Sequence, residues 1–178
     1  MINVMDSTKD FFEFLFEKHG TLFSKQAKET LFAQGDCVQS VFALKQGEVR
    51  LVRHLENGLP LSIHRVSQGL VGEGALFSQT YHCSGVALTD VSGWWMKKDR
   101  LLALLSAEPA GLQMIGARLT QQLHRARQLL EIRSIVGIDH QIDAYVDCFG
   151  KPANGKTLAD ELGVSPETIY RSQGWKGL

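Results

Sequence analysis

The chain has 178 residues, of which 44% are hydrophobic, and a formal net charge of zero at pH 7. This length and composition allow one domain or one and a half with a real core, and the balanced charge excludes a global basic field for nucleic acid. The three cysteines are scattered and form no CxxC pair, which disfavours a zinc site or a disulfide framework and predicts reduced thiols in a cytoplasmic protein. The sequence has no apolar run of the roughly 18 residues that a membrane span needs, and its N-terminus lacks the layout of a signal peptide.

The N-terminal part of the sequence predicts a helix followed by a β domain. Residues 10–20, DFFEFLFEKHG, form an apolar cluster that predicts a leader helix ending at Gly20. From Thr30 to about Met96, short runs alternate apolar and polar residues, with glycines about 11 residues apart. This pattern predicts an antiparallel sandwich or barrel, with a hairpin turn at Asn57 and Gly58 because such a pair accepts a positive φ.

The period of the sequence becomes helical after Trp95. A short helix is expected to stop at Pro109, and a long helix follows over 109–133. The stripe on one face of the long helix comprises Leu112, Ile115, Leu119, Gln122, Ala126 and Leu129, with Leu123 and Leu130 beside it. The opposite faces carry Arg118, Gln121, His124, Arg125 and Arg127. A narrow stripe on a long helix predicts a coiled-coil-like dimer helix, and the alternative is a core helix packed on the chain's own sandwich.

Five segments together resemble the cAMP receptor protein/FNR family of bacterial transcription regulators. They are LFAQGD (31–36), VFALKQGEVRLV (41–52), GLVGEGALF (69–77), the long helix, and TLADELGVSPETIYR (157–171). The resemblance implies an α+β chain with a jelly-roll effector domain over 1–108, a dimerisation helix over 109–133 and a winged helix-turn-helix over 134–178. It also implies double-stranded DNA, a small-molecule effector, a second copy of the chain and RNA polymerase as partners.

The glycine-rich segment around Glu73 predicts a tight turn that opens into a short helix, a geometry that can bind an anion. In cAMP-binding members of the family, the glutamate of this segment binds the ribose and an Arg-Ser pair holds the cyclic phosphate. Here Ser84 stands at the serine position but Cys83 replaces the arginine, and a thiol cannot supply its bidentate charge, so cAMP is disfavoured. The candidate effector-binding residues are Gly72, Glu73, Gly74, Ala75, Cys83, Ser84, Leu123 and His124.

Two other sensor chemistries of the family can be compared with this sequence. The first cysteine is Cys37, so the N-terminal cysteine group of an iron–sulfur sensor is missing. His82, Cys83 and His124 offer ligands for haem, a metal or a redox centre. The simpler interpretation is a strand start and a solvated helix residue, because lone imidazoles and thiols rarely ligate without a further spaced partner. The identity of the effector stays open.

Residues 157–171 match the spacing of a helix-turn-helix. The template has a small residue, a turn glycine and a later aliphatic, which are Ala159, Gly163 and Ile169. Thr157 is predicted to cap the first helix, and Ser165 the second, which starts at Pro166. The candidate DNA-binding residues are Ser165, Glu167, Thr168 and Arg171, because arginine reads guanine and glutamate reads cytosine in the major groove.

The sequence departs from the template after Ile169. Ser172 stands where another buried aliphatic is expected, and Gly174 disfavours a helix interior, so the second helix is expected to have barely two turns. Before Leu178 there is no sequence for the family's β-hairpin wing, which predicts an incomplete helix-turn-helix. The cations of this tail merely offset its acids: Lys156, Arg171 and Lys176 against Asp160, Glu161 and Glu167.

Two functions follow from these patterns. The first is an effector-responsive, DNA-binding transcription regulator that acts as a homodimer. The second is a small-molecule-binding or interaction module that has lost DNA binding through its shortened C-terminus. No Ser/His/Asp spacing, metal motif or Walker loop is present, so an enzyme is disfavoured and no catalytic or metal-binding residue is predicted.

Overall fold

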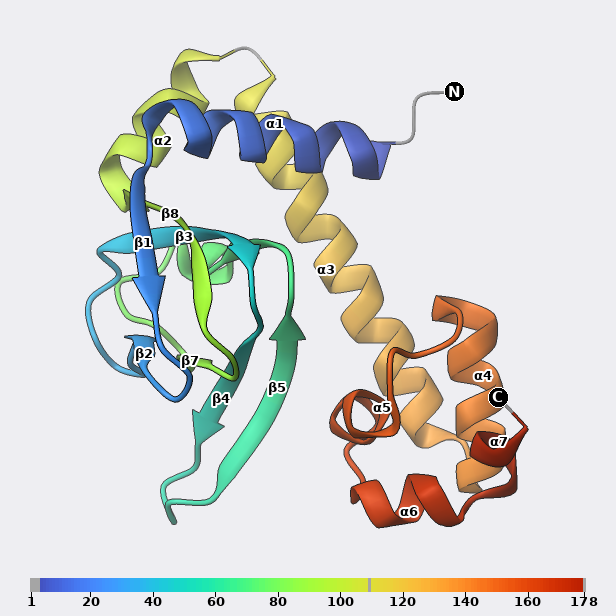
Figure 1. The fold of residues 1–178 in the computed structure, drawn as a ribbon. Coiled ribbons are helices and arrows are strands. Elements are labelled where there is room, and N and C mark those ends of the chain that lie inside the picture. Colours follow the sequence, from blue (N-terminus) through green and yellow to red (C-terminus); the bar gives the residue numbers. More distant parts are fainter. Residues whose placement is uncertain (1–3, 109, 178) are drawn as a thin grey trace. The chain divides into compact units, whose positions relative to one another are not determined.

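The computed structural model describes residues 4–108 and 110–177, shown in Figure 1. Its helices are α1 (Val4–His19), the single 3-10 turn η1 (Glu73–Ala75), α2 (Lys98–Ala107), α3 (Gly111–Ser134), α4 (Ile138–Phe149), α5 (Gly155–Leu162), α6 (Pro166–Arg171) and α7 (Gln173–Lys176). Its strands are β1 (Thr21–Lys25), β2 (Thr30–Phe32), β3 (Ser40–Gln46), β4 (Val49–His54), β5 (Pro60–Val66), β6 (Gly69–Val71), β7 (Ser84–Ala87) and β8 (Val91–Lys97). A β-sheet domain followed by helices confirms the α+β class. Pro109, the expected helix stop, lies outside the described residues.

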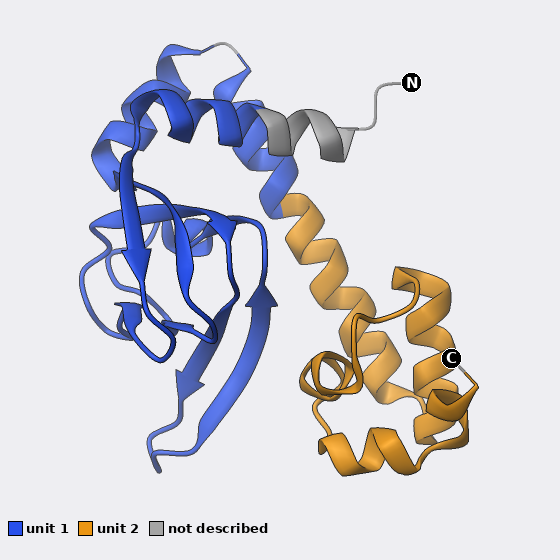
Figure 2. Ribbon diagram, viewed as in Figure 1, with its two compact units in different colours: residues 1–119 blue, residues 120–178 orange. Residues whose placement is uncertain are grey.

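The chain divides into two compact units, Met1–Leu119 and Thr120–Leu178 (Figure 2). The division falls inside α3, whereas the sequence suggested a boundary at residue 108. The first turns of α3 belong to the first unit because Ile115, which is 2% exposed, packs in the same core as α1 and α2.

The first unit contains two antiparallel four-stranded sheets, in the orders β1-β8-β3-β6 and β2-β7-β4-β5. Alternate residues of β3 serve two cores, since Val41 and Ala43 pack with the helices while Phe42 and Leu44 pack between the sheets. The predicted hairpin turn joins β4 to β5. In this turn Gly58 has a φ of 80° and its N–H donates to the Leu55 carbonyl, which confirms the prediction.

Helix α3 has two apolar faces, so the predicted single stripe was wrong in part. Ile115 and Leu129 pack into the cores of the units that hold them. The large apolar side chains exposed on α3 are instead Leu112, Leu123 and Leu130, at 53%, 50% and 64%. A stripe drawn at helical spacing could not separate these two faces, because residues of different faces also lie three or four positions apart, as Leu112 does from Ile115 and Leu119 from Leu123.

The second unit packs the C-terminal half of α3 with α4, α5, α6 and α7. Its buried core comprises Ile132, Ile142, Tyr145, Leu158, Ala159, Leu162 and Ile169. Within residues 4–108 and 110–177, no helix combines the length and the apolar character that crossing a bilayer requires.

Candidate functional site

The segment around Glu73 has the backbone that the sequence predicts. Strand β6 ends at Val71, and Gly72 then adopts a left-handed φ of 91° before the single turn of η1. A side chain at Gly72 would be strained at this φ, and its Cβ would lie 3.5 Å from the Phe32 ring. The tight glycine turn that opens into a short helix is therefore confirmed.

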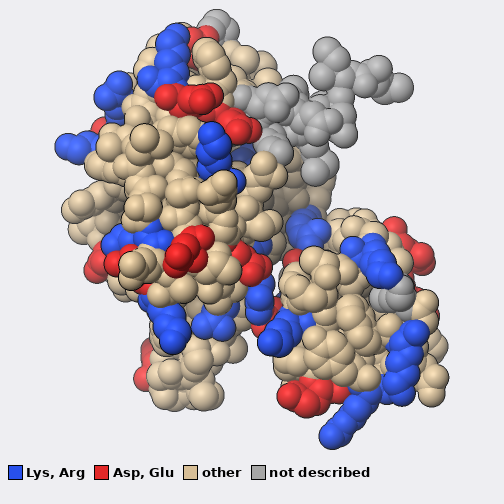
Figure 3. All heavy atoms as spheres, in the orientation of Figure 1, with Lys and Arg blue, Asp and Glu red and all other residues tan. Residues whose placement is uncertain are grey.

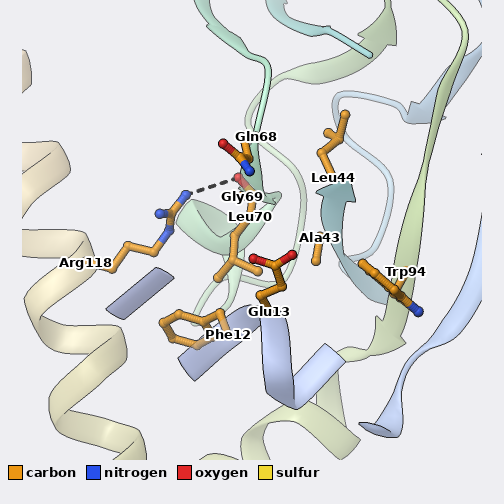
Figure 4. A pocket seen from close by; sticks show the side chains of 9 residues that line it. All are labelled: Phe12, Glu13, Ala43, Leu44, Gln68, Gly69, Leu70, Trp94 and Arg118. Carbon is orange, nitrogen blue, oxygen red and sulfur yellow. Dashed lines mark hydrogen bonds between the residues drawn. The ribbon is translucent and has the colours of Figure 1, made fainter. Parts of the chain in front are cut away.

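The carboxylate of Glu73 is buried and already has a cationic partner. Glu73 is 4% exposed, and its Oε1 accepts a hydrogen bond from Nε of Arg118 at 2.9 Å and forms an ion pair with Nη2 at 2.7 Å. Nη2 of Arg118 also donates to the Leu70 carbonyl at 3.3 Å, the dashed line in Figure 4. Arg118 was predicted on a solvent face of the helix, which is wrong because this buried carboxylate holds its guanidinium.

The two residues at the positions of the family's phosphate-binding pair face inward. Cys83 is 3% exposed in the core between the sheets, and burial raises the pKa of its thiol, opposed by the charge of Arg53. The thiol is therefore neutral at neutral pH. Ser84 is also buried, and its Oγ accepts a hydrogen bond of 3.0 Å from the Gln34 N–H. Neither residue offers a cation to a phosphate.

Aromatic rings fill the space beside these two residues. The rings of Phe32 and Tyr81 are stacked with their centroids 4.2 Å apart. The Phe32 ring also covers Gly85, where an added Cβ would lie 2.8 Å from it. The Tyr81 hydroxyl is fixed by donating to the Ser40 carbonyl at 2.6 Å. A planar ligand between the sheets would have to displace these rings.

A small pocket lies on the helix-covered side of the sheet that contains β3, with a volume of about 30 Å³, room for about one water molecule. Figure 4 shows its lining: Phe12, Glu13, Ala43, Leu44, Gln68, Gly69, Leu70, Trp94 and Arg118. Its apolar floor and single-water size do not suit a nucleotide.

The structure groups the candidate effector residues only in part. Gly72, Glu73, Gly74, Ala75, Cys83 and Ser84 lie in the first unit. Ala75 and Cys83 share one core there. Leu123 and His124 lie in the second unit and are exposed on α3. His82 is exposed while its neighbour Cys83 is buried. Among the described residues, no three His, Cys, Asp or Glu side chains are grouped to hold a metal ion.

Helices α5 and α6 and the turn between them follow the predicted spacing. Gly163 ends α5 with a left-handed φ of 74°, and its N–H donates to the Ala159 carbonyl at 2.8 Å. Ala159 and Ile169 are fully buried where the two helices meet. Ser165 caps α6, since its Oγ accepts from the Thr168 N–H at 3.2 Å.

The cap of α5 differs from the prediction. Asn154 is the N-cap, with its Oδ1 accepting from the Thr157 N–H at 2.9 Å and from the Thr157 hydroxyl at 3.2 Å. The prediction that Thr157 caps this helix is therefore wrong, because the amide side chain three residues earlier captures the free N–H and starts the helix there.

The outward face of α6 carries the remaining candidate residues. Glu167, Thr168 and Arg171 are exposed. The pKa of Glu167 is lowered by a hydrogen bond from its own N–H, by one from Ser165 and by the charge of Arg171. Glu167 is thus ionised at neutral pH and stands beside a cation on an open helix face. Basic and acidic side chains are interspersed elsewhere too, on the surface drawn in Figure 3.

Helix α6 has six residues and ends where the sequence departs from the template. Ser172 is buried, donates to the Ile169 carbonyl at 2.7 Å and caps α7 by accepting from the Trp175 N–H at 3.2 Å. Gly174 donates its N–H to Oδ1 of Asp139 at 2.8 Å, which ties α7 to α4. The expectation of a second helix of barely two turns is confirmed.

Comparison with known proteins identifies the first unit. The family model of the cyclic nucleotide-binding domain matches residues 22–108. Residues 22–108 are thus similar in sequence to the cyclic nucleotide-binding domain, and we use that name for them below. No curated protein matches the sequence.

Solved structures with the same fold extend the likeness beyond the cyclic nucleotide-binding domain. FixK2 from Bradyrhizobium japonicum has a TM-score of 0.71 at 16% identity, covering 85% of this chain and 81% of FixK2. CLP from Xanthomonas campestris, described as a c-di-GMP responsive global regulator, has a TM-score of 0.68 at 20% identity, covering 93% of this chain and 88% of CLP. The Thermus thermophilus catabolite activator protein has a TM-score of 0.55 at 20% identity, covering 96% of this chain and 81% of that one. These comparisons confirm, at the level of the fold, the resemblance to the cAMP receptor protein/FNR family.

Two functional candidates in the structure were not found from the sequence. Arg118 is the partner of the glutamate of the cyclic nucleotide-binding domain, and Arg125 is the partner of Glu161, which is 6% exposed. The sequence counted Glu161 only as an acid that offsets the cations of the tail, and in the structure Arg125 holds it inside the helical unit. Both arginines looked like solvent-facing residues of an amphipathic helix, and no local sequence signal marks their partners.

Proposed function

We propose that the chain is a DNA-binding transcription regulator of the cAMP receptor protein/FNR type, acting in the cytoplasm. The observation that carries this proposal is the exposed pair Glu167 and Arg171, presented by α6 behind the turn at Gly163, in a chain with a cyclic nucleotide-binding domain. In this proposal α5 and α6 form the helix-turn-helix. Arg171 donates to guanine, and Glu167 accepts from cytosine in the major groove. Ser165 and Thr168 complete the proposed DNA-binding set.

The active form in this proposal is a homodimer that pairs through α3. Leu112, Leu123 and Leu130 are exposed on this helix, and the exposed Ala126 lies three residues after Leu123 and four before Leu130. A 24-residue helix with such a seam is suited to coiled-coil pairing with a second copy. The dimer would place two α6 helices about one DNA turn, roughly 34 Å, apart. RNA polymerase is the further partner proposed for the DNA-bound dimer.

An effector in the cyclic nucleotide-binding domain would bias the dimer between two arrangements, which requires different affinities for the two. The proposed contact residues in the first unit are the turn at Gly72, Glu73, Gly74 and Ala75, with Cys83 and Ser84. Leu123 and His124 are proposed contacts from α3. Because Cys83 is buried and neutral, we expect the effector to be something other than cAMP.

A mobility-shift titration of the full chain tests the proposal. Random-sequence duplexes are first selected for binding, and the affinity of the enriched duplex is then measured over a range of salt concentrations. A dimer that reads two half-sites should give a steep linear fall of log affinity with log salt. Failure to enrich any sequence, with a folded dimeric protein, would contradict the proposal.

One observation favours a second candidate function, an interaction or small-molecule-binding module that does not bind DNA. Helix α6 is only six residues long, and the chain leaves it at Ser172 to form α7. A helix of this length offers little surface to the major groove of DNA. This candidate predicts a stable dimer in sedimentation with no DNA shift at any salt concentration. The same titration therefore separates the two functions.

A further inference from the structure

A second buried glutamate lies in the helical unit. Glu161 is on α5 and is 6% exposed. Burying a carboxylate is costly unless it is paired and hydrogen-bonded, so its surroundings must compensate the charge. Neither the cyclic nucleotide-binding domain nor the outward face of α6 uses this residue.

Three side chains from two other helices converge on Glu161. One carboxylate oxygen, Oε2, accepts from Nη2 of Arg125 at 2.6 Å and from the Tyr145 hydroxyl at 2.8 Å. The backbone carbonyl of Glu161 accepts from Nε and Nη2 of Arg133 at 2.9 and 2.6 Å. We call these four residues the Glu161 network. It joins α5 to α3 through both arginines and to α4 through the tyrosine.

The surroundings of the network keep its donors in place. The Arg125 guanidinium lies 4.2 Å from the centroid of the Phe149 ring, which also packs edge-on against Tyr145. Burial, and then Glu161, raise the pKa of Tyr145 to about 12, so its hydroxyl stays a donor at neutral pH. The Arg125 pKa is also raised, since the bond to Glu161 and its charge outweigh burial.

Such a network contributes more to the orientation of the helices than to the stability of the unit. Ion pairs in protein interiors give little net stability relative to apolar residues of similar size, but they satisfy their groups in only one arrangement. The apolar core around Ile142 and Leu158 supplies the non-directional adhesion of the unit. The network fixes α5 on α3, and α6 follows α5 after the short turn at Gly163.

We propose that Glu161 is a positioning residue for DNA reading, which holds α5, and with it α6, in one orientation on α3. The inference rests on the proposed function, because it assigns the network a role in presenting α6 to DNA. It predicts that losing the network loosens the geometry of the two α6 helices in a dimer before it loosens the fold.

The test replaces the charges of the pair together, as Glu161→Leu with Arg125→Met, in the full chain. The probe is a duplex that the wild-type protein has enriched from random sequence, together with versions whose half-sites are moved by inserted base pairs. We expect the melting temperature to stay within a few degrees, the affinity for the enriched duplex to fall about tenfold, and the dependence on half-site spacing to flatten. Glu131→Gln, at an exposed site on α3, is the matched control and should change none of these.

Wild-type affinity and unchanged spacing dependence in the double variant would overturn the inference. If the double variant does not fold, Glu161→Gln is measured with the same readouts, since it keeps the shape and removes the charge. Hydrogen exchange provides a readout without DNA: Glu161→Gln should speed exchange in α5 and α6 more than in α4, and a uniform change would overturn the inference. If the wild-type protein enriches no duplex, only the proposed function is contradicted. The exchange measurement still decides the role of Glu161.

Discussion

The turn at Gly72 and the turn at Gly163 both keep the backbone of their motif, but they differ in what their polar side chains do. Both glycines are left-handed, at φ 91° and 74°. Beside Gly72, the Glu73 carboxylate is buried against Arg118. Beyond Gly163, α6 instead presents Glu167 and Arg171 to solvent.

In both turns the backbone and the side chains of the motif carry separate information. A glycine with positive φ preserves the shape of a site, whereas the partners of its polar groups decide whether the site is open. In the cyclic nucleotide-binding domain the polar groups are already satisfied inside the unit. On α6 they remain available to an external partner.

The largest expected effect on the free energy of unfolding is that of Arg118→Ala, which removes the cationic partner of Glu73. This change leaves the Glu73 carboxylate buried without its cation, which should lower the free energy of unfolding by about 3 kcal/mol. Chemical denaturation followed by tryptophan fluorescence measures it, because Trp94 lies in the core of the same unit. Arg127→Ala, an exposed arginine of the same helix, is the control and should cost under about 0.5 kcal/mol. Equal stability of the two variants would show that the ion pair does not close the site.

The open surface is tested by Arg171→Ala. Losing a bidentate contact with guanine should weaken binding to the enriched duplex by about 2 kcal/mol and relax the sequence preference at one position. Fluorescence anisotropy at fixed salt measures both effects. Arg100→Ala, at an exposed site in the first unit, should leave affinity unchanged. An Arg171→Ala variant with wild-type affinity would remove α6 as the reading helix.

A smaller effect is expected where the backbone alone is changed, with Gly163→Ala. The nearest atoms to an added Cβ are 3.9 Å away on Arg133, so the cost is the left-handed φ and should be about 1 kcal/mol of unfolding free energy. Gly163→Asn should recover much of this loss, because asparagine tolerates that conformation. Thermal denaturation of the two variants would give the same midpoint if the turn did not require a left-handed residue.

The smallest expected effect is that of cAMP on the wild-type protein. With a neutral, buried thiol at Cys83, calorimetry should detect at most micromolar binding. Cys83→Arg should not create tight binding, since the stacked rings of Phe32 and Tyr81 occupy the adjacent space. A nanomolar Kd in either protein would mean that the domain opens far more easily than its packing suggests.

The sequence was most informative where function depends on backbone conformation. The local chemistry of Gly163, Ser165 and Pro166 predicts a helix end, a cap and a helix start. In the structure Gly163 ends α5, Ser165 caps α6 and Pro166 begins it. The short α6 was equally predictable from Ser172 and Gly174. The fold of the first unit followed from alternation and glycine spacing together with the family resemblance.

The sequence was least informative where a residue's partner lies far along the chain. Arg118 and Glu73 are 45 positions apart, and Arg125 and Glu161 are 36 apart. An arginine on an amphipathic helix gives the same local pattern whether it meets water or a buried carboxylate. The cap at Asn154 was missed for a different reason, since Asn154 and Thr157 are both good caps and only the geometry decides between them.

The ion pair of Glu73 with Arg118 also sets a threshold for any sensor built on this domain. A guanidinium tethered in the same folded unit competes at an effective concentration of about millimolar or more. A molecule that offers only a hydroxyl or a single positive charge to Glu73 therefore cannot displace Arg118 when its own concentration is low. Signals that reach this carboxylate must be abundant, or must bring additional contacts of their own.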